Sequence, residues 1–482
     1  MVRTTGKEII SNLIWRMMER FGAQGVTFIV SLVLARVLDP EIYGTVALVT
    51  VITSILQVFI DGGLGAALIQ KKDADNYDFS TVFYFNIVFC FMLYGVLFIS
   101  APLFASAYSE PDLTPVVRTS GLILIISGVK NILQAYVSKY LLFKKFFFAT
   151  LGGTIAAAIT GIWMAYHGYG VWALVAQNLI NTGIDTIILW MIVRWRPKCY
   201  FSYKRLRILF SYGWKLLVSA LIDRLWTQLR QLIIGGLYSA KDLAFYNKGH
   251  EFPEYATAAI NTSIDSVLLP VMAKSQDNIE EVRDLTRRSI MLSSYVMWPV
   301  MMGLSACAEP MIRILITEKW IAAVPYLRIF CITYAFYPVH SANLSAIKAV
   351  GRSDIFLKLE IIKKVSGAII LFVSMWSGPM VMAFSLLISG ILGQVINSWP
   401  NKKLLGYSYR QQVRDIFPSV LLSAFMFLAV YLISFLPWPD LLIISVQIPV
   451  GILVYILGSA IFKMEPFLLI MKVLFRKDRI YG

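Results

Sequence analysis

Apolar stretches of about 20 residues recur along the whole chain and leave few folds open to it. About 14 can be distinguished, centred near residues 24, 54, 91, 127, 157, 181, 223, 259, 296, 333, 367, 389, 426 and 451. Each is long enough to cross the hydrocarbon core of a bilayer as a helix. In lipid, every backbone polar group must be bonded within the protein, which favours helices. The sequence therefore predicts an all-α integral membrane protein with about 14 transmembrane helices.

The composition agrees with a membrane protein. Of the residues, 58% are apolar and 15% are charged, and the mean hydropathy is +0.69. Soluble domains are about 45–50% apolar and about 25% charged. The first, seventh and eighth stretches carry several charges and are the weakest predicted spans. Because the first contains Arg16, Glu19 and Arg20, the N-terminus is not expected to be a cleavable signal peptide.

The chain also repeats itself. Three ordered matches show this: Trp15-Arg16 with Trp214-Lys215, Ile60-Asp61-Gly62-Gly63-Leu64 with Ile264-Asp265-Ser266-Val267-Leu268, and Pro115-Val116-Val117-Arg118 with Pro325-Tyr326-Leu327-Arg328. The offsets drift slowly: 214 − 15 = 199, 265 − 61 = 204 and 325 − 115 = 210. Such a pattern predicts a duplicated unit of about 200 residues, which in a membrane protein indicates two similar lobes.

The repeat divides the chain into predicted domains. These are an N-lobe with six helices, a basic linker, a C-lobe with six helices, a second basic linker, two extra helices and a basic tail: residues 1–194, 195–208, 209–400, 401–415, 416–463 and 464–482. Because each lobe has an even number of spans, both lobes begin on the same side of the membrane. The repeats are therefore expected to be parallel.

The net charge of +16 would suggest nucleic acid in a soluble protein. Its distribution favours a membrane topology instead. With the N-terminus in the cytoplasm, roughly 29 Lys and Arg fall inside and roughly 4 outside. Both termini are therefore expected to be cytoplasmic, and the basic loops to face anionic lipid rather than nucleic acid.

Several kinds of chemistry have no support. A phosphate-binding G-x-x-x-x-G-K-[ST] loop does not occur. The outside loops are short, the three histidines form no nucleophile motif, and the four cysteines are scattered without a C-x-x-C pair. We therefore expect no enzyme, no cofactor and no metal site.

Ionisable residues within the spans are the functional candidates, because charge is costly in lipid. The first span carries Arg16 and Arg20, and its repeat mate carries Lys215, Arg224 and Arg230. Such cations could hold phosphate oxygens of an anionic substrate. Alternatively, Arg16, Arg20 and Lys215 lie near the cytoplasmic end and extend toward lipid headgroups.

Two further pairs follow the repeat. Lys130 and His340 share the offset 340 − 130 = 210 and are expected at matched depths, as substrate contacts or as packing residues. Asp61 and Asp265 are matched carboxylates. They could couple transport to a proton or cation, or else cap a helix end or pair with Arg16 or Lys215.

The same stretches carry a family resemblance. The relevant motifs are Leu34-Ala35-Arg36-Val37-Leu38-Asp39-Pro40-Glu41-Ile42-Tyr43-Gly44, Asp61-Gly62-Gly63-Leu64-Gly65, Thr317-Glu318-Lys319-Trp320 and Ser408-Tyr409-Arg410-Gln411. In their order and spacing they resemble the Wzx-type branch of the multidrug/oligosaccharidyl-lipid/polysaccharide superfamily, especially exporters for colanic or teichuronic acid.

The resemblance implies a fold and an activity. Such proteins form two six-helix lobes in a V around a central cavity, some with two extra helices, in the bacterial cytoplasmic membrane. They move undecaprenyl-pyrophosphate-linked oligosaccharide outward by alternating access for capsule, exopolysaccharide, O-antigen or teichuronic-type polymers. The cations expected to line the cavity are Arg16, Arg20, Lys130, Lys215, Arg224, Arg230 and His340. A monomer is expected, with transient contact to polymerase machinery.

Three alternatives remain open. A lipid II flippase or a cation-coupled multidrug exporter would belong to the same superfamily. Drug exporters usually need acidic groups for cationic substrates, whereas the deep charges here are mostly basic. A membrane polymerase or ligase would carry a large outside loop rich in Arg and His, which this chain lacks.

Overall fold

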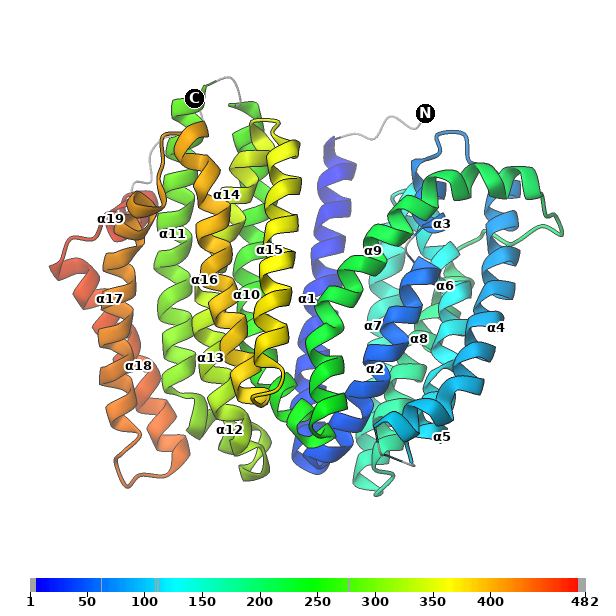
Figure 1. Ribbon diagram of the computed structural model, residues 1–482, viewed down its shortest axis with the longest axis horizontal. Helices are drawn as coiled ribbons and strands as arrows, with labels where there is room; N and C mark the ends of the chain where they lie inside the picture. The colour runs from blue at the N-terminus through cyan, green and yellow to red at the C-terminus, as the bar shows by residue number, and fades with distance from the viewer. Residues whose placement is uncertain (1–5, 62, 109, 111, 276–277, 476–482) are drawn as a thin grey trace. The chain divides into compact units, whose positions relative to one another are not determined.

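The computed structural model describes residues 6–61, 63–108, 110, 112–275 and 278–475, and its regular elements are all helices (Figure 1). It forms two compact units, residues 1–244 and 245–482. The prediction of an all-helical chain is confirmed for the described residues.

Ten described helical segments are long and apolar enough to cross a membrane: residues 17–37, 40–70, 76–107, 113–139, 143–166, 279–306, 318–349, 379–404, 409–433 and 440–461. Helices α8, α9, α10 and α15 are not among them. Of these, α9 and α10 are the seventh and eighth predicted spans. Their charges make them, with the first, the weakest of the predicted spans. The total of about 14 stays a prediction.

The first unit is a helical bundle. Its elements are α1 Gly6–Val37, α2 Pro40–Asp61, α3 Leu64–Gln70, α4 Asn76–Ala107, α5 Leu113–Ser120, α6 Leu122–Lys139, α7 Phe143–Tyr166, α8 Val171–Ile192 and α9 Tyr203–Leu237. Helix α7 packs between α1 and α8, and α6 packs on α2, α4 and α8. Helix α9 lies along α2 and α3 (Figure 1).

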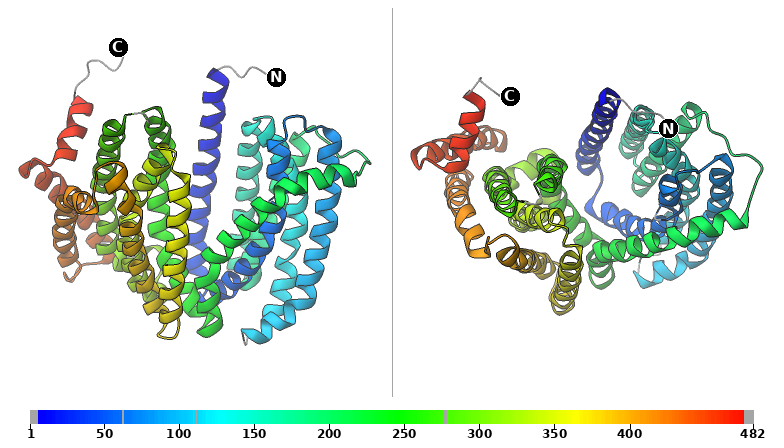
Figure 2. Two further views of the ribbon diagram at one scale, coloured as in Figure 1. Left: turned by 45° about the horizontal axis from the view of Figure 1, so that its top comes forward. Right: turned by 90° about the horizontal axis from the view of Figure 1, so that it is seen from above.

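Helix α10, Ala240–Lys274, crosses into the second unit. The unit continues with α11 Ile279–Ala306, α12 Ala308–Ile316, the 3-10 helix η1 Glu318–Ala323, α13 Val324–Ala335, α14 Tyr337–Ala349, α15 Ser353–Ser374, α16 Pro379–Leu404, α17 Tyr409–Ile433, α18 Asp440–Ile461 and α19 Glu465–Phe475. Helix α11 packs on α13, α14 and α17, and α18 packs on α17 (Figure 2).

Large apolar side chains cover the outer faces of these helices. Ile99 on α4, Val373 on α15 and Ile461 on α18 are 79%, 70% and 74% exposed. A soluble protein rarely presents apolar surface on this scale. In a bilayer the same surface faces lipid, while small residues allow helices to approach one another closely inside.

One close approach positions α9. A Cβ atom added to Gly63 would lie 2.7 Å from the carbonyl oxygen of Gly213, so backbone meets backbone there. Only glycine permits this contact between the start of α3 and the first third of α9. Lys215 follows Gly213 by two residues.

The helix boundaries repeat with the same drift as the sequence matches. Helices α2 and α10 begin at Pro40 and Ala240, and α4 and α11 begin at Asn76 and Ile279. Helix α15 begins 353 − 143 = 210 residues after α7. The two copies also share a broken segment, α5 with α6 in the first and α13 with α14 in the second. The duplication therefore extends from a few motifs to the helix plan of both copies.

A fourth repeat match becomes visible once helix starts are known. Ser202 caps α9 and Ser408 caps α17, each accepting a bond from a backbone N–H three residues on. The surrounding residues also agree, Phe201-Ser202-Tyr203-Lys204 with Tyr407-Ser408-Tyr409-Arg410. Serine at this position satisfies an otherwise unpaired helix donor. The helix after each lobe therefore begins in the same way.

Candidate functional site

The first unit holds a polar cluster on α6 among otherwise apolar helices. The ammonium of Lys130 lies 2.6 Å from Oδ2 of Asp185 on α8. Asn131 donates to Oδ1 of Asp61 on α2 over 2.9 Å, and Gln57 donates to Ser127 over 2.9 Å. We call these six residues the lobe-one cluster.

One face of α6 makes all these contacts. Ser127, Lys130 and Asn131 follow the i, i+3, i+4 spacing that places side chains on the same side of a helix. The structure therefore brings two predicted candidates, Lys130 and Asp61, into one cluster. The sequence analysis missed Asp185, although a single carboxylate within the sixth apolar stretch was a signal that could have found it.

The Lys130–Asp185 pair is held away from water. The side chains are 20% and 5% exposed. Oδ1 of Asp185 has no hydrogen-bond partner among the described residues. A buried pair of this kind is stable only while both charges remain, because either one alone would be uncompensated. The pair therefore ties α6 to α8 within the first unit.

The second unit holds a related cluster around His340 on α14. Nδ1 of His340 and Nδ2 of Asn397 on α16 lie 3.1 Å apart, with the amide as donor when that ring nitrogen is unprotonated. A Cβ added to Gly393 would lie 3.2 Å from the imidazole. Nearby on α15, Lys363 pairs with Glu360 over 2.5 Å. We call His340, Asn397, Lys363 and Glu360 the lobe-two cluster.

The two clusters occupy corresponding helices. Lys130 and His340 each lie on the second half of the broken segment, α6 and α14. Each contacts the last helix of its repeat, α8 or α16. The contact in the first unit is ionic, and that in the second is a hydrogen bond with an amide.

The other predicted residues are more dispersed. Lys215 is exposed on α9, and Arg224 and Arg230 on the same helix are partly buried. Asp61 is the last residue of α2. This position fits the alternative in which Asp61 lies at a helix end. The side chains of Arg16, Arg20 and Asp265 lie outside the described residues.

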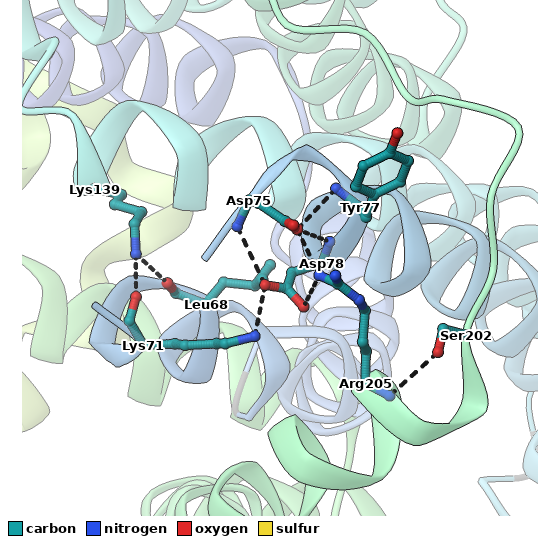
Figure 3. Close-up of polar contacts among 8 residues, drawn as sticks. All are labelled: Leu68, Lys71, Asp75, Tyr77, Asp78, Lys139, Ser202 and Arg205. Atoms are coloured by element: carbon teal, nitrogen blue, oxygen red, sulfur yellow. Dashed lines mark hydrogen bonds and ion pairs between the residues drawn. The ribbon is translucent and has the colours of Figure 1, made fainter. Parts of the chain in front are cut away.

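A second ionic feature anchors the basic linker after the first lobe (Figure 3). Asp78, whose side chain is fully buried, lies 2.6 Å from Lys71 and 3.0 Å from Arg205. Arg205 also lies 2.7 Å from Asp75, and Asp75 and Asp78 form the capping box of α4. We call Lys71, Asp75, Asp78 and Arg205 the lobe-one clamp.

Electrostatics in this clamp favour the charged forms of Arg205 and Asp75. The hydrogen bonds with Asp75 and Asp78 raise the pKa of Arg205. Burial alone would raise the pKa of Asp75, but backbone hydrogen bonding at Asp78 and the bond from Arg205 outweigh it and lower that pKa. The sequence analysis interpreted this linker only as a topology signal and so missed Arg205.

A matching clamp follows the second lobe with the charges exchanged. Here the cation, Arg287, is on α11 and lies 3.0 Å from Asp415 on α17 and 2.8 Å from Glu465 on α19. Tyr407 in the second linker donates to Asp415 over 2.8 Å. We call Arg287, Tyr407, Asp415 and Glu465 the lobe-two clamp.

Ten long apolar helical segments within the described residues, with polar clusters between them, are typical of a multi-span membrane protein. Its fold is shared with solved structures. The lipid II flippase MurJ, inward closed, matches with a TM-score of 0.74 and 17% identity over 98% of this chain and 100% of that one. An inward-facing multidrug resistance MATE family transporter of the MOP superfamily matches with a TM-score of 0.60 and 13% identity over 82% and 98%.

The chain belongs to the polysaccharide biosynthesis protein family, whose profile matches residues 33–325. The teichuronic acid biosynthesis protein TuaB of Bacillus subtilis (strain 168) is 25% identical over 80% of this chain and 79% of its own length. The lipopolysaccharide biosynthesis protein WzxC of Escherichia coli (strain K12) is 23% identical over 86% of each. The succinoglycan biosynthesis transport protein ExoT of Rhizobium meliloti (strain 1021) is 22% identical over 75% and 73%. The resemblance noted from sequence motifs is thereby confirmed.

Proposed function

We propose that this protein moves a lipid-linked anionic oligosaccharide from the inner to the outer leaflet of the bacterial cytoplasmic membrane, for assembly of a cell-surface polysaccharide. The observation that carries the proposal is the match of residues 33–325 to the polysaccharide biosynthesis family, together with the flippase fold. Relatives named for biosynthesis and transport of three different polysaccharides support the same class of substrate.

Cations on α9 are the proposed contacts for the diphosphate or acidic sugars. Lys215, Arg224 and Arg230 supply positive charge along α9. Arginine and lysine form charge-assisted hydrogen bonds with phosphate oxygens. Arg16 and Arg20 are proposed as further contacts because of their repeat relation to α9.

Lys130 has a different proposed part, because Asp185 already neutralises it. A diphosphate that competes for Lys130 would open this ion pair, so substrate binding is linked to the contact between α6 and α8. Asp61 and Asp265 stay candidates for the coupling ion, and His340 for a substrate contact in the second unit.

Topology and assembly complete the proposal. The excess of Lys and Arg in alternate loops supports cytoplasmic N- and C-termini. Because the duplicated chain supplies both lobes, a monomer that alternates its access is proposed as the working unit. Transient contact with the polymerase machinery would follow from the need to pass on its product.

The test compares two double variants on the same helix. Arg224→Ala with Arg230→Ala should abolish export of polymer while the protein level stays normal. Lys204→Ala with Arg207→Ala removes the same charge from exposed positions near the start of α9 and should leave export intact. Wild-type amounts of surface polymer in the first variant would contradict the cationic contacts.

A lipid II flippase is the second candidate, favoured by the TM-score of 0.74 with MurJ. Cells depleted of their own lipid II flippase should stay inviable when this chain is expressed, if the primary proposal holds. Rescue of growth would make a lipid II flippase the first candidate in place of the oligosaccharide flippase. A cation-coupled multidrug exporter would instead raise resistance to cationic drugs without any effect on surface polymer.

A further inference from the structure

We propose that the second unit carries a separate binding site for an anionic phospholipid of the cytoplasmic leaflet. The site is a pocket of about 770 Å³ bordered by α11, α17 and the turn from α18 to α19. It contains none of the residues assigned to the oligosaccharide. Its lining has an apolar part and a charged part, which fit a ligand with apolar chains and a charged headgroup.

The wall of the pocket is apolar and open on the side of α17. Phe417, Leu421 and Phe425 line it and are 56%, 59% and 62% exposed. Their i, i+4, i+8 spacing makes one continuous stripe along the helix. Met291 and Leu422 complete the wall. A stripe of this kind in a membrane protein accommodates an acyl chain lying along the helix.

One part of the lining is formed by the lobe-two clamp. Arg287, Asp415 and Glu465 all line the pocket, and both carboxylates are bonded to the guanidinium. Three helices, α11, α17 and α19, are thereby held together around the cavity. Because Arg287 is already paired, this part of the lining shapes the site and attracts no additional anion.

Two further cations are also part of the lining. Arg414 and Lys463 line the pocket and are exposed, and neither has an ion-pair partner among the described residues. Lys463 has a positive φ of 47°, and its N–H bonds to the carbonyl of Ala460 as α18 ends. This turn, rather than a flexible loop, presents the lysine.

The charge balance selects the headgroup. Three cations and two carboxylates line the pocket, a net charge of +1, which matches one phosphodiester better than a diphosphate. Arg414 lies near the start of α17, close to the second basic linker, which the distribution of Lys and Arg predicts to be cytoplasmic. Basic pockets between membrane helices on that side are typical sites for anionic lipid headgroups.

Native mass spectrometry of the full chain, with phosphatidylglycerol or phosphatidylcholine added, tests the site. Arg414→Gln with Lys463→Gln should reduce the retained phosphatidylglycerol about tenfold. Lys402→Gln with Lys403→Gln removes equal charge from exposed positions in the last turn of α16 and should change the retained phosphatidylglycerol less than about twofold. Equal losses in both variants, an unchanged first variant, or equal retention of phosphatidylcholine by the wild type would overturn the proposal.

A second variant addresses the apolar wall. Leu421→Glu places a carboxylate in the stripe without touching the clamp, and it should abolish phosphatidylglycerol retention in protein that keeps its thermal unfolding transition. Displacement of phosphatidylglycerol by an equimolar polyprenyl diphosphate would assign the groove to the transport substrate and contradict a separate site. These measurements read binding directly, so failure of the proposed transport function would not alter them.

Discussion

The lobe-one and lobe-two clusters occupy corresponding helices but differ in their chemistry. In the first unit Lys130 on α6 forms an ion pair with Asp185 on α8. In the second unit His340 on α14 shares a hydrogen bond with Asn397 on α16. Duplication has preserved the helix plan while the charges within it have diverged. Substituting Lys130 should therefore cost a different free energy of unfolding from substituting His340, although the two positions match.

The largest expected effect follows from breaking the ion pair. Lys130→Met leaves Asp185 without its partner, and the loss of one member of a buried pair costs about 3–5 kcal/mol. Thermal unfolding in detergent, compared with the wild type, should show this as a large fall in midpoint.

A double variant sharpens the interpretation. Lys130→Met with Asp185→Leu removes both charges and should recover most of the lost stability. If Lys130 contacts substrate, this stable protein will still fail to export polymer. Export at the wild-type rate would instead assign the pair to structure alone. A double variant as unstable as the single one would contradict the ionic account.

The next effect concerns the clamps. Asp78→Asn removes the buried carboxylate that bonds both Lys71 and Arg205, and hydrogen bonds to charged groups contribute about 1.5–3 kcal/mol. Hydrogen exchange in residues 195–205 should accelerate, because the first linker loses its anchor. Asp415→Asn in the lobe-two clamp is the matched comparison, and it should release the second linker and leave the first unchanged.

A smaller effect is expected in the lobe-two cluster. His340→Leu deprives the amide of Asn397 of its partner, at a cost of about 1–3 kcal/mol. The fall in unfolding midpoint should be less than for Lys130→Met, because no charge is left alone. An equal or larger fall would show that the contact between His340 and Asn397 stabilises the protein at least as much as the pair of Lys130 and Asp185.

Acid should loosen the lobe-one clamp by a modest amount. The folded state lowers the pKa of Asp75 from its ordinary value of 3.8. The stabilisation is therefore present above that value and is lost as the pH falls through the lower, folded-state pKa. Hydrogen exchange in the first linker should rise below about pH 4, and Asp75→Asn should remove this part of the pH dependence.

The smallest effect is predicted for an exposed pair. Arg352 and Asp354 pair on the surface at 2.9 Å, and the guanidinium lowers the pKa of Asp354 to about 2. Exposed pairs contribute little because water screens them. Asp354→Ala should leave both the unfolding midpoint and export unchanged, which makes it a control for the buried variants.

Sequence periodicity and the repeat were sufficient to predict the helical membrane fold, because length and apolarity leave few other structures in lipid. They also placed Lys130 and His340 on matched segments. They could not identify Asp185 or Asn397, because a partner on another helix depends on which faces meet after packing. Arg205 was missed for a related reason, since a basic linker explains membrane topology equally well whether or not one of its residues is buried against a carboxylate.

We infer that this protein moves a lipid-linked anionic oligosaccharide by means of cations on α9. The most direct test is a reconstituted vesicle assay that follows transfer of a polyprenyl-diphosphate-linked oligosaccharide between leaflets. The wild type and the Lys204→Ala, Arg207→Ala variant should both accelerate transfer, and the Arg224→Ala, Arg230→Ala variant should reduce it to the rate of protein-free vesicles. Transfer by that last variant at the wild-type rate would contradict the account.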